Sequence, residues 1–344
     1  MHNILSFSLV ELEGIFEKLN LKKFSAKQVY QWVYQKHVTE FEKMSNISKT
    51  AMQVIKDNFY IPKLGIIDIL VDKKDNTTKI LFELEDKQKI ETVVMEFDYG
   101  FSICLSTQVG CNMGCKFCAS GLLKKVRDLH EYEIVNQLFV ANQYINEKFN
   151  KNISNVVVMG IGEPFDNYEN LKKALKIFTE PFGLGIGARH ITVSTCGLID
   201  KILTYAKDFP QCNLAVSLHA PNDTIRNKIM PVNTVYNINK LIGELRKYSK
   251  VVNRRITFEY LLLENVNDSK ENANELANLL QGLNCYVNII LYNKISEHDF
   301  ARSKNASQFA KTLKSNNINV TTRLERGLEI EAACGQLRAK YENN

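Results

Sequence analysis

From about residue 100 onward, β-rich runs alternate with amphipathic stretches, and this alternation restricts the chain to few folds. The β-rich runs are FSICLS (101–106), NVVVMG (155–160), HITVST (190–195), NLAVSL (213–218), RITFEYLLL (255–263) and YVNIILYN (286–293). Apolar residues at helical spacing predict helices over 131–148, 168–179, 236–250 and 269–281. Such a series indicates an α/β fold, in which helices cover a parallel sheet. Six units and a seventh β-rich run at 318–325 predict a partial (β/α)6 barrel, because a full barrel needs eight.

The chain before this series has two further parts. Apolar residues at helical spacing predict helices within 9–20, 25–36 and 48–59, with Ser25 and Ser48 as N-caps of the second and third. Three β-rich runs then lie between turn-like segments and predict a small antiparallel sheet. We therefore expect an N-terminal helical domain over 1–61, a small β extension over 62–97 and the barrel over 98–344.

Charge and cysteine content indicate the cellular compartment and the kind of binding partner. The first twenty residues carry early acidic groups and no long apolar run, which predicts neither a signal peptide nor a membrane span. Eight cysteines then indicate a reducing compartment, and we expect a cytoplasmic location. The formal net charge of +6 is compatible with a polyanionic partner but is too small to prove one.

Polar motifs follow the predicted strands of the barrel. They are VGCNMGCKFCAS (109–120), GIGEP (160–164), STCG (194–197), SLHAPND (217–223) and Asn293. Parallel α/β sheets bind their ligands at the carboxyl ends of the strands. The five motifs therefore predict one pocket at that end of the barrel.

Cys111, Cys115 and Cys118 form a C-x3-C-x2-C run, which indicates a metal centre. Structural zinc usually takes two pairs of ligands, and no second cysteine cluster follows this run. Iron–sulfur cubanes normally take four thiolates, so three would leave one iron of a [4Fe–4S] cluster open to a ligand. Zinc with a distant fourth ligand and three incidental thiols remain the alternatives.

The cysteine spacing, with Phe117 before the last cysteine, resembles the signature of the radical S-adenosylmethionine (SAM) superfamily. The resemblance implies a [4Fe–4S] cluster whose open iron binds SAM and generates a 5′-deoxyadenosyl radical. It also implies that Gly162 and Glu163 of GIGEP receive the SAM amino group. The further SAM contacts that it implies are Ser194, Ser217, Leu218, His219 and Asn293.

Two more cysteines indicate a particular family within this superfamily. Cys104 lies seven residues before the cluster run, and Cys334 lies in EIEAACGQLRAK near the C-terminus. With RHITVSTCG, SLHAPND and MPVN, they resemble the RlmN/Cfr family of RNA adenine methyltransferases, from about residue 22 to the end. GEP, GLGIGARH and GQLRAK are closer to the RlmN branch. That branch implies methylation of adenine C2 in 23S rRNA, near the peptidyl transferase centre, and in the tRNA adenine 3′ of the anticodon. The alternative is methylation at C8, as in the Cfr branch.

The resemblance also implies a reaction in two stages. One SAM methylates Cys334, and a second SAM provides the radical that activates this methyl group for addition to adenine. Cys104 then takes part in release, either by taking the ring proton or by attacking the Cys334 sulfur, which leaves a Cys104–Cys334 disulfide for reduction. Glu91 matches the position of a proton acceptor in the family. Without the resemblance, Cys104 reads as a small buried residue and Glu91 as a solvated glutamate. Cys196, Cys212 and Cys285 are predicted to be structural.

The partners implied are 23S rRNA, tRNA and an electron donor of flavodoxin or ferredoxin type, with a monomeric enzyme. Tyr30, Trp32 and Tyr34, between Lys27 and Lys36, are candidates for stacking on bases and binding phosphates. An amphipathic core helix explains the same pattern. A zinc-stabilised RNA-binding module without catalysis is the alternative from a different functional class.

Overall fold

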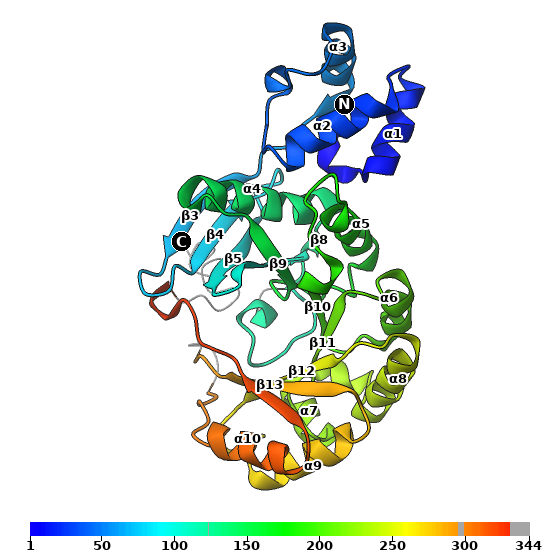
Figure 1. The fold of residues 1–344 in the computed structure, drawn as a ribbon. Coiled ribbons are helices and arrows are strands. Elements are labelled where there is room, and N and C mark those ends of the chain that lie inside the picture. Colours follow the sequence, from blue (N-terminus) through cyan, green and yellow to red (C-terminus); the bar gives the residue numbers. More distant parts are fainter. Residues whose placement is uncertain (123, 295–298, 331–344) are drawn as a thin grey trace.

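The computed structural model describes residues 1–122, 124–294 and 299–330. Its centre is a curved ten-stranded sheet in the order β14-β13-β12-β11-β10-β9-β6-β5-β4-β3 (Figure 1). Seven of these strands are parallel: β6 (Gly100–Cys104), β9 (Ile153–Val158), β10 (Ile191–Thr195), β11 (Asn213–Ser217), β12 (Ile256–Leu262), β13 (Cys285–Leu291) and β14 (Asn319–Thr322). The sheet does not close on itself, which agrees with the predicted partial barrel.

Helices cover the convex side of the parallel strands (Figure 1). Their apolar faces meet the buried faces of the strands, and Leu171, Leu175 and Phe178 of α5 are fully buried, as are Val193 and Val216. The hydrophobic core therefore lies between the helical layer and the sheet. The helices are α4 (Glu131–Phe149), α5 (Tyr168–Thr179), α6 (Ile202–Asp208), α7 (Asp223–Ile229), α8 (Ile238–Val251), α9 (Lys270–Leu280) and α10 (Ala306–Ser315).

The predicted small antiparallel sheet continues the barrel sheet. It consists of β3 (Gly65–Val71), β4 (Thr78–Glu83) and β5 (Lys89–Phe97). Strand β5 pairs antiparallel with β6, in a register that runs from Val93–Cys104 to Phe97–Gly100. This pairing places side chains of β5 beside Cys104, so the extension contributes to the concave face of the barrel.

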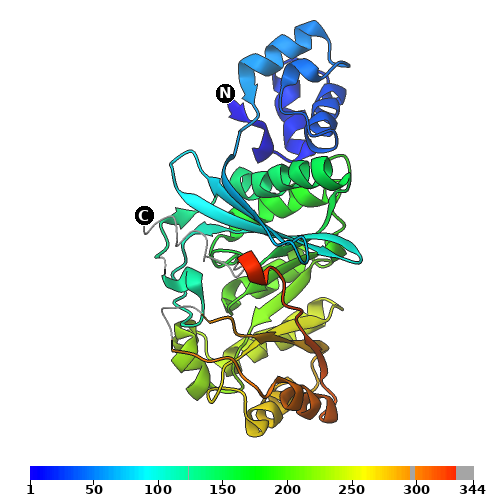
Figure 2. The same ribbon diagram turned by 90° about the vertical axis from the view of Figure 1, so that its left-hand side faces the viewer.

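The N-terminal segment forms a helical unit at one end of the molecule (Figure 2). It contains α1 (Leu9–Lys18), α2 (Lys23–Tyr34) and α3 (Lys49–Asn58), with the short parallel strands β1 (His2–Asn3) and β2 (Phe59–Tyr60). Ser48 caps α3 by accepting a hydrogen bond from the N–H of Ala51, as predicted. The prediction for Ser25 was wrong, because α2 begins at Lys23. The tight connection after α1, where Asn20 has φ 58°, brings the chain into the helix before Ser25.

Short elements fix the loops at the carboxyl ends of the strands. Strands β7 (Gln108–Val109) and β8 (Arg127–Asp128) pair on either side of the cysteine run. The 3-10 helices are η1 (Ile4–Ser6), η2 (Phe41–Lys43), η3 (Ala119–Leu122), η4 (Ala188–His190), η5 (Ile199–Lys201), η6 (Pro231–Thr234) and η7 (Leu328–Ile330).

Within the described ranges, no helix has the length and apolar character needed to cross a membrane.

Candidate functional site

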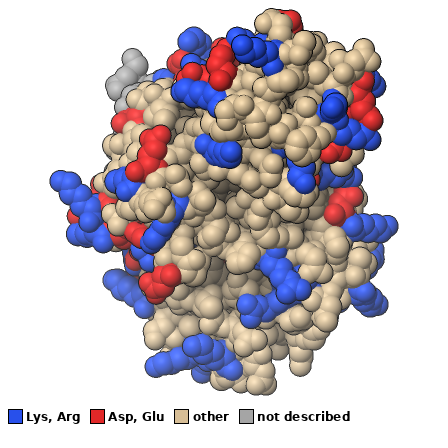
Figure 3. Space-filling model, turned by 45° about the horizontal axis from the view of Figure 1, so that its top comes forward, with Lys and Arg blue, Asp and Glu red and all other residues tan. Residues whose placement is uncertain are grey.

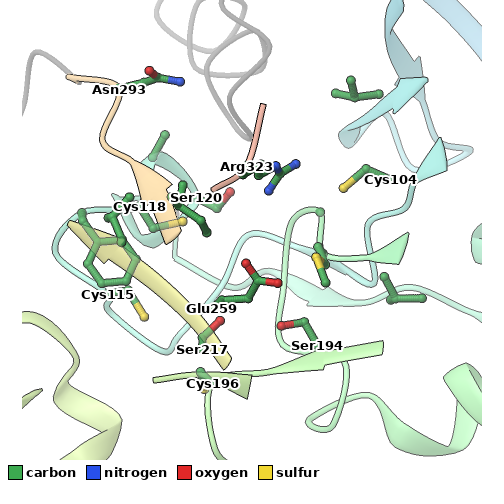
Figure 4. A pocket seen from close by; sticks show the side chains of 18 of the residues that line it. Cys104, Cys115, Cys118, Ser120, Ser194, Cys196, Ser217, Glu259, Asn293 and Arg323 are labelled. Atoms are coloured by element: carbon green, nitrogen blue, oxygen red, sulfur yellow. The ribbon is translucent and has the colours of Figure 1, made fainter. Parts of the chain in front are cut away.

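A cavity of about 660 Å³ opens at the carboxyl ends of the parallel strands (Figure 4). In Figure 4, Cys104 projects into it from one side, Cys115 and Cys118 lie on the other, and Ser194 and Ser217 form part of its floor. Motifs far apart in the sequence therefore meet at one site, as the strand-end argument predicted. Ten of the predicted site residues line this cavity: Cys104, Cys111, Cys115, Cys118, Gly162, Glu163, Ser194, Ser217, His219 and Asn293.

Three predicted site residues are not among those that line the cavity. Leu218 is buried beside it, and its N–H donates to the carbonyl oxygen of Glu259 at 3.1 Å. Glu91 is buried on β5, where its carboxylate lies 3.5 Å from the Nζ of Lys79. Cys334 lies outside the described residues. The buried ion pair shows that Glu91 is not the solvated glutamate that a strand start suggests.

The cysteine loop is held from both ends and from one side. The β7–β8 pair brackets it, and the N–H of Lys116 donates to the carbonyl oxygen of Ile229 at 2.9 Å. At Gly121, an added Cβ would lie 2.8 Å from the carbonyl oxygen of Cys115, so only glycine allows this close approach. These backbone contacts therefore fix the course of the loop that carries the thiols.

The three thiols are half-buried and lie within one another's electrostatic influence. Burial raises the pKa of Cys111 to about 11, and the nearby Cys118 contributes in the same direction. Burial also raises the pKa of Cys115, with contributions from Cys118 and Cys111. A bound cation reverses such shifts, because it stabilises thiolates. Three soft sulfur donors at a cavity wall fit an iron–sulfur cluster.

Within the part of the chain that the structure describes, no three His, Cys, Asp or Glu side chains are grouped to hold one metal ion. The ligands of a single zinc ion all lie within bonding distance of that ion. In a cubane, each thiolate binds a different iron, so the sulfurs are spaced more widely. Three thiolates from one short loop would leave one iron of a [4Fe–4S] cluster open to a ligand.

Glu163 presents a buried carboxylate to the cavity. Gly162 has φ 108°, and an added Cβ there would lie 2.6 Å from the Cβ of Gln108, which requires glycine in this turn. The carboxylate of Glu163 accepts hydrogen bonds from the N–H of Cys196 at 2.7 Å and from that of Phe165 at 3.0 Å. Burial nevertheless raises the pKa of Glu163. A cationic ligand would compensate the buried negative charge.

His219 is a neutral hydrogen-bond donor at the cavity wall. Burial lowers its pKa to about 3, and the nearby positive charge of Arg226 acts in the same direction. Its Nδ1 accepts a hydrogen bond from the N–H of Leu261 at 3.0 Å, which assigns the proton of the neutral ring to Nε2. Its ring packs edge-on against Phe117, with centroids 4.8 Å apart. The His219 ring is thus held by contacts that leave one N–H donor.

Arg226 was not recognised from the sequence. This buried arginine of α7 donates to the carbonyl oxygens of Cys196 at 2.6 Å, Ser217 at 3.1 Å and Leu218 at 3.1 Å, and to Oδ1 of Asn233 at 3.0 Å. It thereby joins the chain after β10 to the chain after β11. A lone arginine in the NDTIRNKI segment gives little signal, because exposed arginines are common in short helices.

Glu259 was also missed. It lies at the centre of the view in Figure 4, on β12, and accepts a hydrogen bond from the amide of Asn288 at 2.9 Å. Burial raises its pKa, while the charge of Arg323 across the cavity and the Asn288 hydrogen bond act in the opposite direction. A single acidic residue inside the apolar RITFEYLLL run is the signal that could have identified it.

Two further interpretations of the sequence change with the structure. Cys196, predicted to be structural, lines the cavity, and its backbone binds both Glu163 and Arg226. Tyr30 and Tyr34 are buried in the α2 core, so their rings are not available to stack on bases. Trp32 is half-buried and donates to Oδ1 of Asn46. The amphipathic core helix is the correct interpretation of α2.

Comparison with known proteins gives two matching family models. The model of the ribosomal RNA large subunit methyltransferase N-terminal domain matches residues 2–61, and that of the radical SAM superfamily matches residues 105–277. A probable dual-specificity RNA methyltransferase RlmN of Malacoplasma penetrans (strain HF-2) is 51% identical over 340 residues, covering 99% of this chain and 97% of the relative. The protein of the same name from Spiroplasma citri is 50% identical over 342 residues, covering 99% of both chains.

A crystal structure of a radical SAM methyltransferase from Sphaerobacter thermophilus matches the fold with a TM-score of 0.92 and 38% sequence identity. The match covers 98% of this chain and 99% of that chain. This likeness confirms the predicted α/β barrel class.

Proposed function

Because the chain belongs to the RlmN family of the radical SAM superfamily, we propose that it methylates C2 of adenine in 23S rRNA and in the tRNA adenine 3′ of the anticodon. The rRNA target would lie near the peptidyl transferase centre. The observation that carries the proposal is the meeting of Cys104, the three-cysteine loop and the buried Glu163 in one cavity. Enzymes of this superfamily use a [4Fe–4S] cluster and SAM.

We propose that Cys111, Cys115 and Cys118 hold the cluster. The cluster with its bound SAM supplies the 5′-deoxyadenosyl radical that activates the methyl group. Three thiols in a backbone-fixed loop suit this purpose, because a preorganised ligand set loses little entropy on binding. Three protein ligands would leave one iron of the cluster free to bind SAM, and the cavity that these cysteines line would hold it.

The SAM contacts follow from the chemistry of the cavity wall. Glu163 would receive the ammonium group, which compensates its buried charge. The Nε2–H of His219 provides a neutral donor to the same ligand. The other SAM contacts that we propose are Gly162, Ser194, Ser217, Leu218 and Asn293, of which Leu218 offers backbone atoms beside the cavity.

The methyl group passes through Cys334. Adenine C2 carries a C–H in an electron-poor ring and cannot attack the methyl group of SAM itself. The thiolate of Cys334 would attack the methyl carbon of SAM, which forms a thioether and displaces S-adenosylhomocysteine as the leaving group. After the methyl carbon has bonded to adenine, the thiolate of Cys104 attacks the Cys334 sulfur. The S–C bond breaks, and the carbon keeps its electron pair and takes up a proton, which completes the methyl group on adenine. A Cys104–Cys334 disulfide forms, and two electrons from the donor later reduce it.

Glu91 is the proposed acceptor of the proton from adenine C2. It lies on the same face of β5 as Val93 and Met95, because side chains two residues apart share a face of a strand. Those two residues line the cavity, whereas Glu91 itself is not among the lining residues, and this shared face is what supports its proposed role. The contact with Lys79 would orient it.

The remaining parts of the proposal concern the setting of the enzyme. We propose a cytoplasmic monomer that receives electrons from a flavodoxin- or ferredoxin-type donor. Residues 1–61 would serve as an RNA-binding accessory domain, 62–97 as an extension of the sheet, and 98–344 as the catalytic barrel with the segment that carries Cys334. Since β5 pairs with β6, the second and third parts share one sheet.

The test is anaerobic reconstitution with iron and sulfide, followed by incubation with SAM, a reductant and an RNA fragment, and nucleoside analysis by mass spectrometry. We expect a brown protein and 2-methyladenosine in the RNA. The appearance of 8-methyladenosine instead would establish the Cfr-like alternative. A colourless protein with stoichiometric zinc and no methylated product would establish the zinc-stabilised RNA-binding module.

A further inference from the structure

The cavity opens beside an exposed aromatic side chain that the proposed chemistry does not use. Tyr99 occupies the two-residue turn between β5 and β6 and is 66% exposed. Most tyrosines of the described chain are buried or half-buried, so this exposure is unusual for the molecule. Tyr99, Phe97 and Arg326 all line the cavity that contains the cysteine loop. The aromatic turn is therefore part of the mouth of the site.

The ring of Tyr99 is held in a fixed orientation. It stacks on Phe97 with centroids 5.0 Å apart and an interplanar angle of 7°. The guanidinium of Arg326 lies 4.7 Å from the centroid of the Phe97 ring. Gly100, with φ 120° and Ser154 Oγ 2.9 Å from the position of an added Cβ, sets the course of the turn. The exposed ring of Tyr99 is therefore supported by its stacking contact with Phe97.

Arg326 belongs to a segment that is attached to the turn between β3 and β4, at the same end of the sheet extension as Tyr99. The N–H of Gly327 donates to Asp75 at 3.0 Å, and the N–H of Glu329 donates to Asp72 at 3.0 Å. Arg323, from the same segment, also lines the cavity. Two guanidinium groups thus lie at a mouth where a polyanion has to enter, which gives the charge complementarity expected for RNA.

We propose that Tyr99 stacks on one of the two nucleobases next to the target adenine, either its 5′ or its 3′ neighbour in the RNA chain. This inference rests on the proposed function, since it assumes an RNA substrate. To reach the cavity, the target base has to leave its stack, and its neighbour then loses a stacking partner. An exposed, preorganised tyrosine ring at the cavity mouth replaces that partner. Aromatic and arginine planes are the usual platforms for unstacked RNA bases.

The test compares Tyr99→Leu and Tyr99→Phe with the native enzyme in binding to an RNA hairpin that contains the target adenine. Loss of the ring should weaken RNA binding about ten-fold, the order found for one stacked base, whereas Tyr99→Phe should stay within about two-fold of native. Tyr144→Leu, on α4 of the convex face, is the matched control and should bind as the native enzyme does. Iron content and thermal unfolding verify that each variant is folded.

A fluorescent readout identifies the stacking itself. Two further hairpins carry 2-aminopurine, whose fluorescence is quenched by stacking, either 5′ or 3′ of the target. We expect quenching in one of them with the native enzyme and its loss with Tyr99→Leu. Native-like RNA binding by Tyr99→Leu, equal weakening by Tyr99→Phe, or no quenching at either position would overturn the inference. Absence of methylated RNA from the native enzyme is a different outcome, which overturns the proposed function.

Discussion

At the residue scale, the buried carboxylate of Glu163 is suited to bind the ammonium group of SAM. Its pKa is raised by burial, although two backbone N–H groups donate to it. SAM brings an ammonium group that favours the ionised form of this carboxylate. Binding of SAM and loss of the Glu163 proton are therefore linked.

Substitution Glu163→Gln should weaken SAM binding about ten-fold or more, because the ion pair between ammonium and carboxylate is replaced by a hydrogen bond from the ammonium to a neutral amide. In the native enzyme, SAM affinity should fall as the pH is lowered toward the raised pKa of Glu163, since the protonated form does not attract the ammonium. The Gln variant should lack this part of the pH dependence. Anaerobic equilibrium dialysis with labelled SAM measures both effects. Equal affinities of native and variant enzymes would exclude the ammonium contact.

Cys334 is predicted to carry the methyl group. The Cys334→Ala variant should retain its cluster, because the cluster thiols come from the loop at 111–118, but should form no methylated RNA. Iron analysis and nucleoside mass spectrometry measure the two properties. Cys212→Ala is the matched control, since Cys212 is buried and does not line the cavity. Methylated RNA from the Cys334 variant would show that this thiol is not the carrier.

Cys104 is predicted to release the RNA from Cys334. Its side chain lines the cavity from β6, within reach of the same space as the cluster loop. In Cys104→Ala we expect an enzyme–RNA adduct that persists through denaturation, because no second thiol attacks the Cys334 sulfur. Gel electrophoresis under denaturing conditions detects the adduct, and the double variant with Cys334→Ala should abolish it. Normal yields of methylated RNA would remove Cys104 from the mechanism.

At the scale of elements, Arg226 links the loops after β10 and β11. Its guanidinium serves several acceptors in a fully buried position, and a neutral side chain leaves these acceptors without their donor. Arg226→Met should lower the free energy of unfolding by roughly 3 kcal/mol, because buried unsatisfied polar groups are costly. Arg246→Met, an exposed arginine that donates to Gln281, should change it by less than about 1 kcal/mol. Urea unfolding followed by circular dichroism compares the two, and similar values would contradict the linking role.

The elements differ in how well the sequence predicts them. Apolar residues at helical spacing predicted α5 over its full length, because that helix packs one continuous face on the sheet. The predicted N-cap of α2 was Ser25, three residues after the observed N-cap Lys22, since a tight turn at Asn20 decides where the helix begins. The pairing of β5 with β6 was not predicted either. It depends on contacts between segments, and a single strand pattern does not specify its neighbour.

At the scale of the whole molecule, the position of the site followed from the topology. Motifs at successive strand ends had to meet once the strands were parallel, so Glu163 and His219 could be assigned to one pocket. Arg226, Glu259 and Lys79 could not be found in this way. Arg226 and Lys79 are lone charged residues within otherwise ordinary segments, and only three-dimensional packing shows that they are buried. For Glu259, the apolar run around it was a signal, but the strand-end argument does not use it. Burial, rather than residue type, distinguishes these groups from solvated charges.

The charge of the whole molecule predicts how RNA binding depends on salt. The formal net charge is +6, and on the face shown in Figure 3 the Lys and Arg side chains stand in separate groups among Asp and Glu. Such a surface contacts few phosphates at once, so the logarithm of the RNA association constant should fall with log salt concentration with a slope of about −2 to −4. Filter binding over a range of salt concentrations measures this slope.

The same salt series separates charge from stacking at the cavity mouth. Tyr99→Leu removes a neutral ring, so its slope should equal that of the native enzyme while its affinity is lower at every salt concentration. Arg323→Gln and Arg326→Gln remove charges and should each reduce the magnitude of the slope if their guanidinium groups contact phosphates. A steep native slope, near −8, would instead require a continuous basic track and contradict binding through a few phosphates and a stacked base.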